Sequence, residues 1–511
     1  MAIYGSKWNK PMERKIQVPI SGTDVVSLPH KVHDGKCADS LNMWVSPSGQ
    51  FEARPGTIGL LKTLLPKPIK AIAFYPKSNK LLVASGSHLY LVDKTYTRHD
   101  ATATDLGALN SITDDDNVSI AIFCGDAFIA SGGVLQKYDG DVLTNLAVNS
   151  YSCPAPESAG CLAVRGNRLW VGQHSGSKLW HSGINDPLDW GRDPASTEGQ
   201  GEDLNGGSFN VDKDDGGIIS GISNFASDLV IFKAGARNSI HKVTGNSSGA
   251  EGDIKREQLA EGASALNHKL SAVVDRDILF SGVAGVQSLQ ITDQLGNIAS
   301  VPVSLEMKPI YDQFQPQCMA FAPVFGVLFL VLGDNHVITY QRERQAWYPW
   351  RFEGFTPCFV DVVEDKVYIG STEGQIYLFD VEETTDDEIP FSKNFTTPAM
   401  SFSASTRQLR MAKFFMVYSS NENGILNVDA RLSFGTDYVH TQNVTSESTT
   451  NSQWDASGWD TLEAQWDGST LNIARVRIGI QGDNIQLRIS SMAPLKVYDM
   501  WCHGAYLSKR R

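Results

Sequence analysis

Residues 366–380 read KVYIGSTEGQIYLFD, and this stretch decides the fold. Two runs rich in β-branched and aromatic residues, Val367–Ile369 and Ile376–Phe379, flank a polar break that contains Gly374. This pattern is typical of a β-hairpin, because branched and aromatic side chains favour strands and glycine permits the turn between them. We therefore expect two paired strands here.

The same hairpin pattern recurs along the chain. Its leading strands begin at Leu81, Phe128, Leu169, Leu229, Ile278, Leu328 and Val367. The copies, about seven in all, start roughly 40 to 60 residues apart, which is close to the period of β-propeller blades. Most copies have a further strand just upstream, as at residues 71–74, 120–123, 161–164 and 359–362. Each blade should hold three recognisable strands and a less regular outer one, whereas unrelated hairpins in β-sandwiches, the alternative, need not recur at a near-constant period.

The texture of the sequence changes near residue 386. The acidic run EETTDDEI at residues 382–389 reads as a boundary, and several strands after it alternate polar and apolar residues. Alternation indicates a half-exposed antiparallel sheet. We therefore predict an all-β protein with an N-terminal extended segment and hairpin (1–60), a β-propeller (61–385) and a C-terminal β-sandwich-like domain (386–511).

Composition excludes several classes of protein. No apolar run is long enough to span a membrane, and the N-terminus lacks the apolar stretch of a secretory signal, so we expect folding in a cytoplasm.

The cysteines show no C-x-x-C spacing and several lie in or beside expected strands, which predicts buried free thiols. The net charge of −13 argues against a surface that grips nucleic acid, although an acidic wall would let a duplex pass without adhering.

No catalytic motif is present. The sequence lacks a phosphate-binding loop, a G-x-S-x-G elbow, an H-E-x-x-H pair and any Cys/His group with zinc spacing. Asp212, Asp214 and Asp215 suggest calcium, but the twelfth position from Asp212 is Ser223 rather than the glutamate of an EF-hand. We expect no catalytic, cofactor-binding or metal-binding residues, and hence not an enzyme.

Several motifs, in their order along the chain, resemble the tail nozzle proteins of short-tailed bacteriophages, also called tail tubular or packaged-DNA-stabilising proteins. They are Asn42 with SPSG at 46–49 and RPGT at 54–57, DPLDW at 186–190, IISGI at 218–222, DLVIFK at 228–233 and SIHKVTG at 239–245. The region of Trp454 and Trp459 and the basic C-terminal tail also resemble that family in residue composition. The likeness spans most of the chain.

The resemblance implies a structural virion protein. In that family a β-propeller with added β domains assembles as a homohexameric ring below the portal and adaptor, extends the DNA exit channel and helps to retain packaged DNA. The implied partners are further copies of the chain, head-to-tail adaptor or portal proteins, tail fibre or needle proteins, and genomic double-stranded DNA in transient contact. The implied location is the virion tail, assembled in the host cytoplasm, with no cofactor.

Interface and channel candidates come from turns, loops and charge. Arg54 lies in a turn and reads as a subunit contact or a solvated turn residue, and the insertion at 183–217 is the candidate gate of the lumen. The full set is Arg54, Trp190, Asp212, Asp214, Asp215, Lys509, Arg510 and Arg511. Two alternatives remain open: a propeller hydrolase acting on surface polysaccharide, and a receptor-binding module of a tail.

Overall fold

The protein is described here from a computed structural model, over residues 12–111, 117–149, 152–191, 205–212, 215–245, 254–290, 302–401, 407–420, 423–432, 438–446, 471–482 and 484–508. Strands dominate this part of the chain. Its short helices are η1 (His268–Leu270), η2 (Leu305–Met307) and α2 (Lys308–Gln313). None of the described helices has the length and apolar character needed to cross a membrane.

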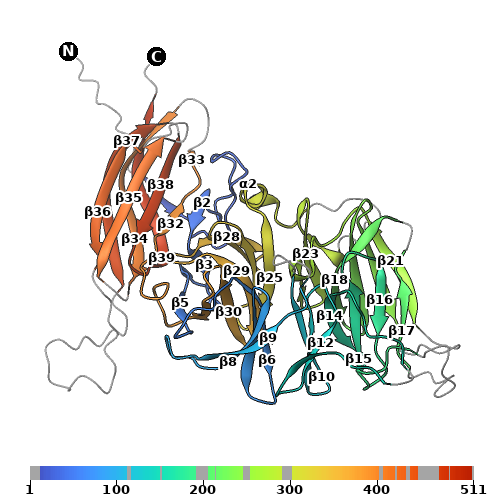
Figure 1. The fold of residues 1–511 in the computed structure, drawn as a ribbon. Helices are drawn as coiled ribbons and strands as arrows, with labels where there is room; N and C mark the ends of the chain where they lie inside the picture. Colours follow the sequence, from blue (N-terminus) through green and yellow to red (C-terminus); the bar gives the residue numbers. More distant parts are fainter. Residues whose placement is uncertain are drawn as a thin grey trace, which may run out of the picture.

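Seven antiparallel sheets follow one another from residue 69 to residue 380 (Figure 1). The first sheet consists of β6 (Ile69–Tyr75), β7 (Lys80–Ser85), β8 (His88–Asp93) and β9 (Ala103–Ala108). The second consists of β10 (Ser119–Phe123), β11 (Asp126–Ala130), β12 (Gln136–Tyr138) and β13 (Leu143–Asn145). The third consists of β14 (Ala159–Arg165), β15 (Arg168–Gln173), β16 (Lys178–His181) and β17 (Gly207–Asn210). The next two are β18 (Gly217–Phe225), β19 (Asp228–Gly235), β20 (Ser239–Thr244) and β21 (Lys255–Glu261); and β22 (Ser271–Val274), β23 (Asp277–Gly282) and β24 (Gly285–Ser288). The last two are β25 (Pro316–Ala322), β26 (Val327–Leu332), β27 (His336–Gln341) and β28 (Ala346–Arg351); and β29 (Pro357–Val363), β30 (Lys366–Ser371) and β31 (Ile376–Asp380).

The seven sheets close into a ring. The first strand of each sheet packs against the first strands of its two neighbours, and β29 of the seventh sheet packs against β6 of the first. This arrangement confirms the predicted seven-bladed β-propeller. The repeated hairpins form the middle of each blade because their apolar side chains are buried on both faces; all six residues of β26 are buried, for example.

The N-terminal segment closes the propeller. Strand β5 (Gly56–Gly59) pairs antiparallel with β31, from Tyr377 opposite Gly59 to Asp380 opposite Gly56. It becomes the fourth strand of blade seven and covers an edge that would otherwise be open. Blade five has three described strands, and the segment after them covers its edge, because the Val303 N–H donates to the Val286 carbonyl at 2.8 Å.

Two further sheets form the C-terminal domain, which lies beside the propeller (Figure 1). One has the order β3 (Met43–Val45), β4 (Phe51–Ala53), β39 (Lys496–Ser508), β34 (Arg407–Ser419) and β37 (Asn472–Gly482), with β1 (Met12–Ile16) also paired to β39. The other has the order β2 (Asp39–Leu41), β32 (Lys393–Thr396), β38 (Asn484–Ser491), β35 (Gly424–Leu432) and β36 (His440–Ser446), with β33 (Met400–Ser401) paired to β38.

The N-terminal residues therefore belong to both bodies of the molecule. Strands β1, β2, β3 and β4 lie in the sheets of the C-terminal domain, and β5 lies in the propeller. The expected hairpin at residues 43–53 is present, with Gly49 in its turn at a φ of 84°. The sequence could not reveal the long-range pairings, because β1, β2, β4 and β5 each have a partner strand more than 300 residues away.

All seven cysteines are free thiols. Four of them, Cys37, Cys161, Cys318 and Cys502, are buried as expected. Cys124 is exposed, contrary to the expectation of burial, because it occupies the tight turn between β10 and β11 at a φ of 49°.

Candidate functional site

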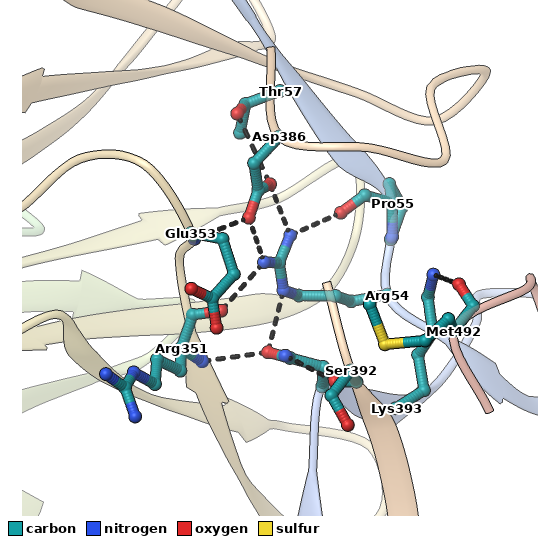
Figure 2. Close-up of polar contacts among 10 residues, drawn as sticks. Arg54, Pro55, Thr57, Arg351, Glu353, Asp386, Ser392, Lys393 and Met492 are labelled. Carbon is teal, nitrogen blue, oxygen red and sulfur yellow. Dashed lines mark hydrogen bonds and ion pairs between the residues drawn. The ribbon is translucent and has the colours of Figure 1, made fainter. Parts of the chain in front are cut away.

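Arg54 lies at the junction of the propeller, its closing strand and the C-terminal domain. Its side chain has no exposed surface, and its guanidinium pairs with the carboxylate of Asp386 at 2.9 Å and 2.5 Å (Figure 2). It also donates to the Asn42 side chain at 3.0 Å, to the Pro55 carbonyl at 2.8 Å and to the Arg351 carbonyl at 2.9 Å. All five guanidinium donors are thus used, as a buried arginine requires.

Aromatic rings enclose the same guanidinium. The ring of Phe391 lies 3.8 Å from its central carbon, and the ring of Phe352 lies 4.3 Å away. Asp386 accepts two further hydrogen bonds, from the Glu353 N–H at 3.0 Å and from the Thr57 hydroxyl at 3.4 Å. The ion pair therefore has a complete set of partners, which compensates for the loss of hydration.

Each residue of the RPGT motif has a role in this junction. Arg54 holds Asp386, the Pro55 carbonyl accepts from Arg54, and Thr57 binds Asp386 through its hydroxyl. Gly56 is needed because a β-carbon there would lie 2.0 Å from the carbonyl oxygen of Thr385. Arg54 is therefore neither a solvated turn residue nor available for a subunit contact, since its side chain is enclosed within the chain.

The centre of the propeller is occupied by η1. This short helix lies between β21 and β22 in the sequence and contacts β18 of blade four and β25 of blade six. Lys269 extends from it to the far side of the ring, where its ammonium donates to the Lys70 carbonyl of β6 at 2.5 Å and lies 5.4 Å from the centre of the Phe359 ring on β29. The side chain therefore crosses the ring axis.

Burial shifts the ionisable groups at this centre. It lowers the pKa of Lys269 to about 8 and the pKa of His268 to about 3, and it raises the pKa of Asp361 to about 6. It also raises the pKa of Cys318 and of Cys358 to about 12, so both thiols stay protonated and are poor nucleophiles.

The innermost strands lack a pair of carboxylates. Across the described residues of β6, β10, β14, β18, β22, β25 and β29, the only acidic side chain is Asp361. A two-carboxylate glycoside hydrolase needs two such groups on either side of its substrate. The described innermost strands therefore do not themselves supply such a pair.

Asp212 and Asp215 surround a lysine in blade four. The Lys233 side chain is fully buried, and its ammonium donates to Asp215 at 2.6 Å and to the carbonyls of Val211 and Asp212 at 2.6 Å and 2.7 Å. Burial alone would raise the pKa of Asp215, but hydrogen bonds from Lys233 and from the Gly217 N–H lower it below its ordinary value.

His241 completes this cluster. Its ring nitrogen lies 3.4 Å from a carboxylate oxygen of Asp212, which also pairs with Arg256 at 3.0 Å. Asp212, Asp215 and His241 are close enough to hold a metal ion, but the Lys233 ammonium already pairs with the Asp215 carboxylate and the Arg256 guanidinium with the Asp212 carboxylate. The cluster is therefore a structural ion-pair network of blade four.

Trp190 is a core residue. It is 2% exposed and packs with apolar side chains of blades two and three, including Phe128 and Leu169. The Ser152 hydroxyl accepts from the Trp190 N–H at 2.7 Å and donates to Asp189 of the same DPLDW motif at 3.5 Å. Asp214, Lys509, Arg510 and Arg511 lie outside the described residues, as do Trp454, Trp459 and residues 192–204 of the candidate gate at 183–217.

Sequence reasoning missed Asp386, Lys233 and Lys269. One signal was available for Lys233, since it occupies a position in the strand DLVIFK whose neighbours are all apolar. A lysine there must be buried, and a buried lysine needs acceptors. Asp386 carries no such signal, because its partner Arg54 lies 332 residues earlier.

Comparisons with known proteins identify no family for this chain. No protein-family model matches the chain, and no curated protein matches it. Among solved structures it is similar to the WD40 β-propeller domain of Doa1, with 11% identity and a TM-score of 0.39 over 64% of this chain and 96% of that one. It is also similar to BamB from Moraxella catarrhalis, with 11% identity and a TM-score of 0.35 over 64% of this chain and 97% of that one. A computationally designed protein, Ika8, is similar with 10% identity and a TM-score of 0.38 over 64% of this chain and 99% of that one.

Proposed function

We propose that this chain is a tail nozzle subunit of a short-tailed bacteriophage. In this proposal, six copies form a ring below the portal and adaptor, and the ring continues the DNA exit channel and helps to retain the packaged genome. The observation that carries the proposal is the ordered set of motifs. The junction at residues 54–57 supports it, because Arg54, Gly56 and Thr57 of the RPGT motif each have a residue-specific role there.

The proposed mechanism is mechanical. Because Lys269 crosses the axis of the propeller, a DNA duplex would run between copies of the chain, and each propeller would act as a rigid wall segment. A net charge of −13 for each copy would give a ring that repels phosphates and so lets DNA slide. The adaptor above and the fibres or needle below would bind the two rims.

No specific observation favours either alternative function. A polysaccharide hydrolase would need a second carboxylate near Asp361, and the described innermost strands carry none. A receptor-binding module would need an exposed ligand site; of the described candidate residues, Arg54 and Trp190 are buried, and Asp212 and Asp215 form ion pairs within blade four.

The copy number of the chain in purified virions tests the proposal. Quantitative mass spectrometry against the major capsid protein should give about six copies per particle, the stoichiometry of a closed ring. A multiple of three well above six would point to fibres and receptor binding instead. Absence of the chain from particles would contradict the nozzle proposal.

A further inference from the structure

The outer face of one C-terminal sheet carries an ordered row of aromatic and basic side chains. Across its strands, Lys15 of β1 lies opposite Trp501 of β39, which lies opposite Phe415 of β34, which lies opposite Arg475 of β37. Side chains two residues apart on a strand share a face. This face therefore also carries the neighbouring row, in which Lys413 lies between His503 and Arg477.

The aromatic rings of the row stack on one another. The Phe415 and Trp501 rings are parallel within 4°, with centres 5.2 Å apart, and the Arg475 guanidinium lies 5.9 Å from the centre of the Phe415 ring. Both rings are partly exposed, and Ile473 beside them on β37 is 62% exposed. We call the surface formed by Lys413, Phe415, Ile473, Arg475, Arg477 and Trp501 the ladder face.

The ladder face has an excess of positive charge. Nearby, Lys15 pairs with Asp499 at 3.3 Å and His503 approaches Glu13 at 3.5 Å. Within the described residues, Lys413, Arg475 and Arg477 have no ion pair, and both arginines are exposed. Three uncompensated cations thus lie together on a chain whose net charge is −13.

Its composition fits a protein partner. Exposed tryptophan, phenylalanine and arginine are the residues enriched at protein–protein interfaces, and arginine and tryptophan often dominate their binding energy. Single-stranded nucleic acid would instead stack its bases on free ring faces. Here the Phe415 ring faces Trp501 on one side and Arg475 on the other, so its faces are already covered.

We propose that the ladder face docks on the acidic surface of a second copy of this chain. The proposal rests on the ring proposed above and names the surface through which its neighbours meet. Charge complementarity supports it: the chain has a net charge of −13, and exposed acids such as Asp365 and Glu382 lie in the loops of blade seven. Opposite charges across such a contact favour correct pairing and fast association.

Charge reversal tests the proposal on the full-length chain. Native mass spectrometry and sedimentation should show that the wild-type chain self-associates at low salt. Arg475→Glu with Arg477→Glu should weaken that association by roughly tenfold or more, because like charges would face each other. Ile473→Asp, an exposed substitution that leaves the charged residues in place, should weaken it as well.

The matched control reverses two exposed cations elsewhere. Lys62→Glu with Lys67→Glu changes the net charge equally on the propeller surface and should leave self-association unchanged. A monomeric wild-type chain, or reversed variants that associate like the wild type, would overturn the proposal. Loss of binding to a DNA duplex with unchanged self-association would also overturn it and assign the face to nucleic acid.

These outcomes are separable from the nozzle proposal. About six copies per particle, together with ladder-face variants that assemble normally, would keep the nozzle function and remove only this interface. Absence from particles would remove the function whatever the self-association of the purified chain.

Discussion

Arg54 holds three separate parts of the chain through one guanidinium. Replacing it with methionine would leave the Asp386 carboxylate buried without its counter-ion, because both side chains have no exposed surface. We expect Arg54→Met to destabilise the protein by about 3 to 5 kcal/mol, the usual cost of breaking a buried ion pair. Denaturant unfolding followed by tryptophan fluorescence would measure the loss.

Arg98 provides the control for this substitution. It pairs with Glu383, Asp387 and Glu388 nearby, but its side chain is 24% exposed. Arg98→Met should therefore cost no more than about 1 kcal/mol. Arg54→Met with Asp386→Leu should recover part of the lost stability, because no charge then stays buried alone. Equal stability of the two single variants would contradict a structural role for the Arg54 pair.

His181 should make the protein sensitive to acid. Burial, with a smaller contribution from Arg168, lowers its pKa from 6.5 to about 4 in the folded chain. Below pH 6.5 the unfolded chain binds the proton more readily, so stability is complete above that pH and falls as the pH decreases towards 4. Between pH 7.5 and pH 5 this residue should cost about 2 kcal/mol.

His181→Gln tests this directly. The variant should lose about 2 kcal/mol less than the wild type between pH 7.5 and pH 5, in unfolding experiments at each pH. The similarly buried His268 stays in both proteins and cancels in the comparison. Parallel pH dependences of the two proteins would show that His181 does not remain neutral in the folded chain.

At the scale of elements, strand β5 determines whether the ring is closed. Gly56 allows the strand to pass against the 383–386 segment, where an added β-carbon would lie 2.0 Å from the Thr385 carbonyl oxygen. Gly56→Ala should therefore destabilise the protein by about 1 to 3 kcal/mol and increase hydrogen exchange in β5 and β31. Gly333→Ala is the control, since an added β-carbon there would lie 3.9 Å from the nearest atom, on Gln317. Unchanged exchange in β31 would contradict the closing role of β5.

The sequence predicts elements well where the signal is local. The hairpins at 81, 128, 169, 229, 278, 328 and 367 each form the middle of a blade, because branched residues and glycine turns determine strands within about 15 residues of chain. The partner of β5 is not predictable in this way. Gly56 and Asp380 pair across more than 300 residues, and no local pattern specifies such a contact.

The candidate site is less predictable than the fold for the same reason. Arg54 was identified as a turn residue because its neighbours in sequence are proline and glycine. Its actual environment comes from Arg351 of β28, from the Phe391 ring before β32 and from Asp386. The charge pattern along any single strand does not predict the ladder face either, because the face forms only when β34, β37 and β39 lie side by side.

At the scale of the whole molecule, the strand pairings in the structure give the propeller different ends from those that the sequence pattern gives. A chain cut at residues 61–385 follows the sequence pattern, but it lacks β5 and Asp386 and leaves the edge of β31 open. A fragment spanning residues 54–391 includes β5, Arg54 and Asp386. We expect the longer fragment to be the more stable and less aggregation-prone of the two, because an open strand edge recruits other chains.

Size-exclusion chromatography and thermal unfolding of the two fragments would decide this prediction. The 54–391 fragment should unfold at a higher temperature, and the backbone amides of its β31 should exchange slowly. The 61–385 fragment should elute partly as aggregate, with fast exchange in β31. If both fragments were equally monomeric and equally stable, the ring would be held closed by packing between blades one and seven, and β5 with the Arg54–Asp386 pair would serve mainly to attach the C-terminal domain.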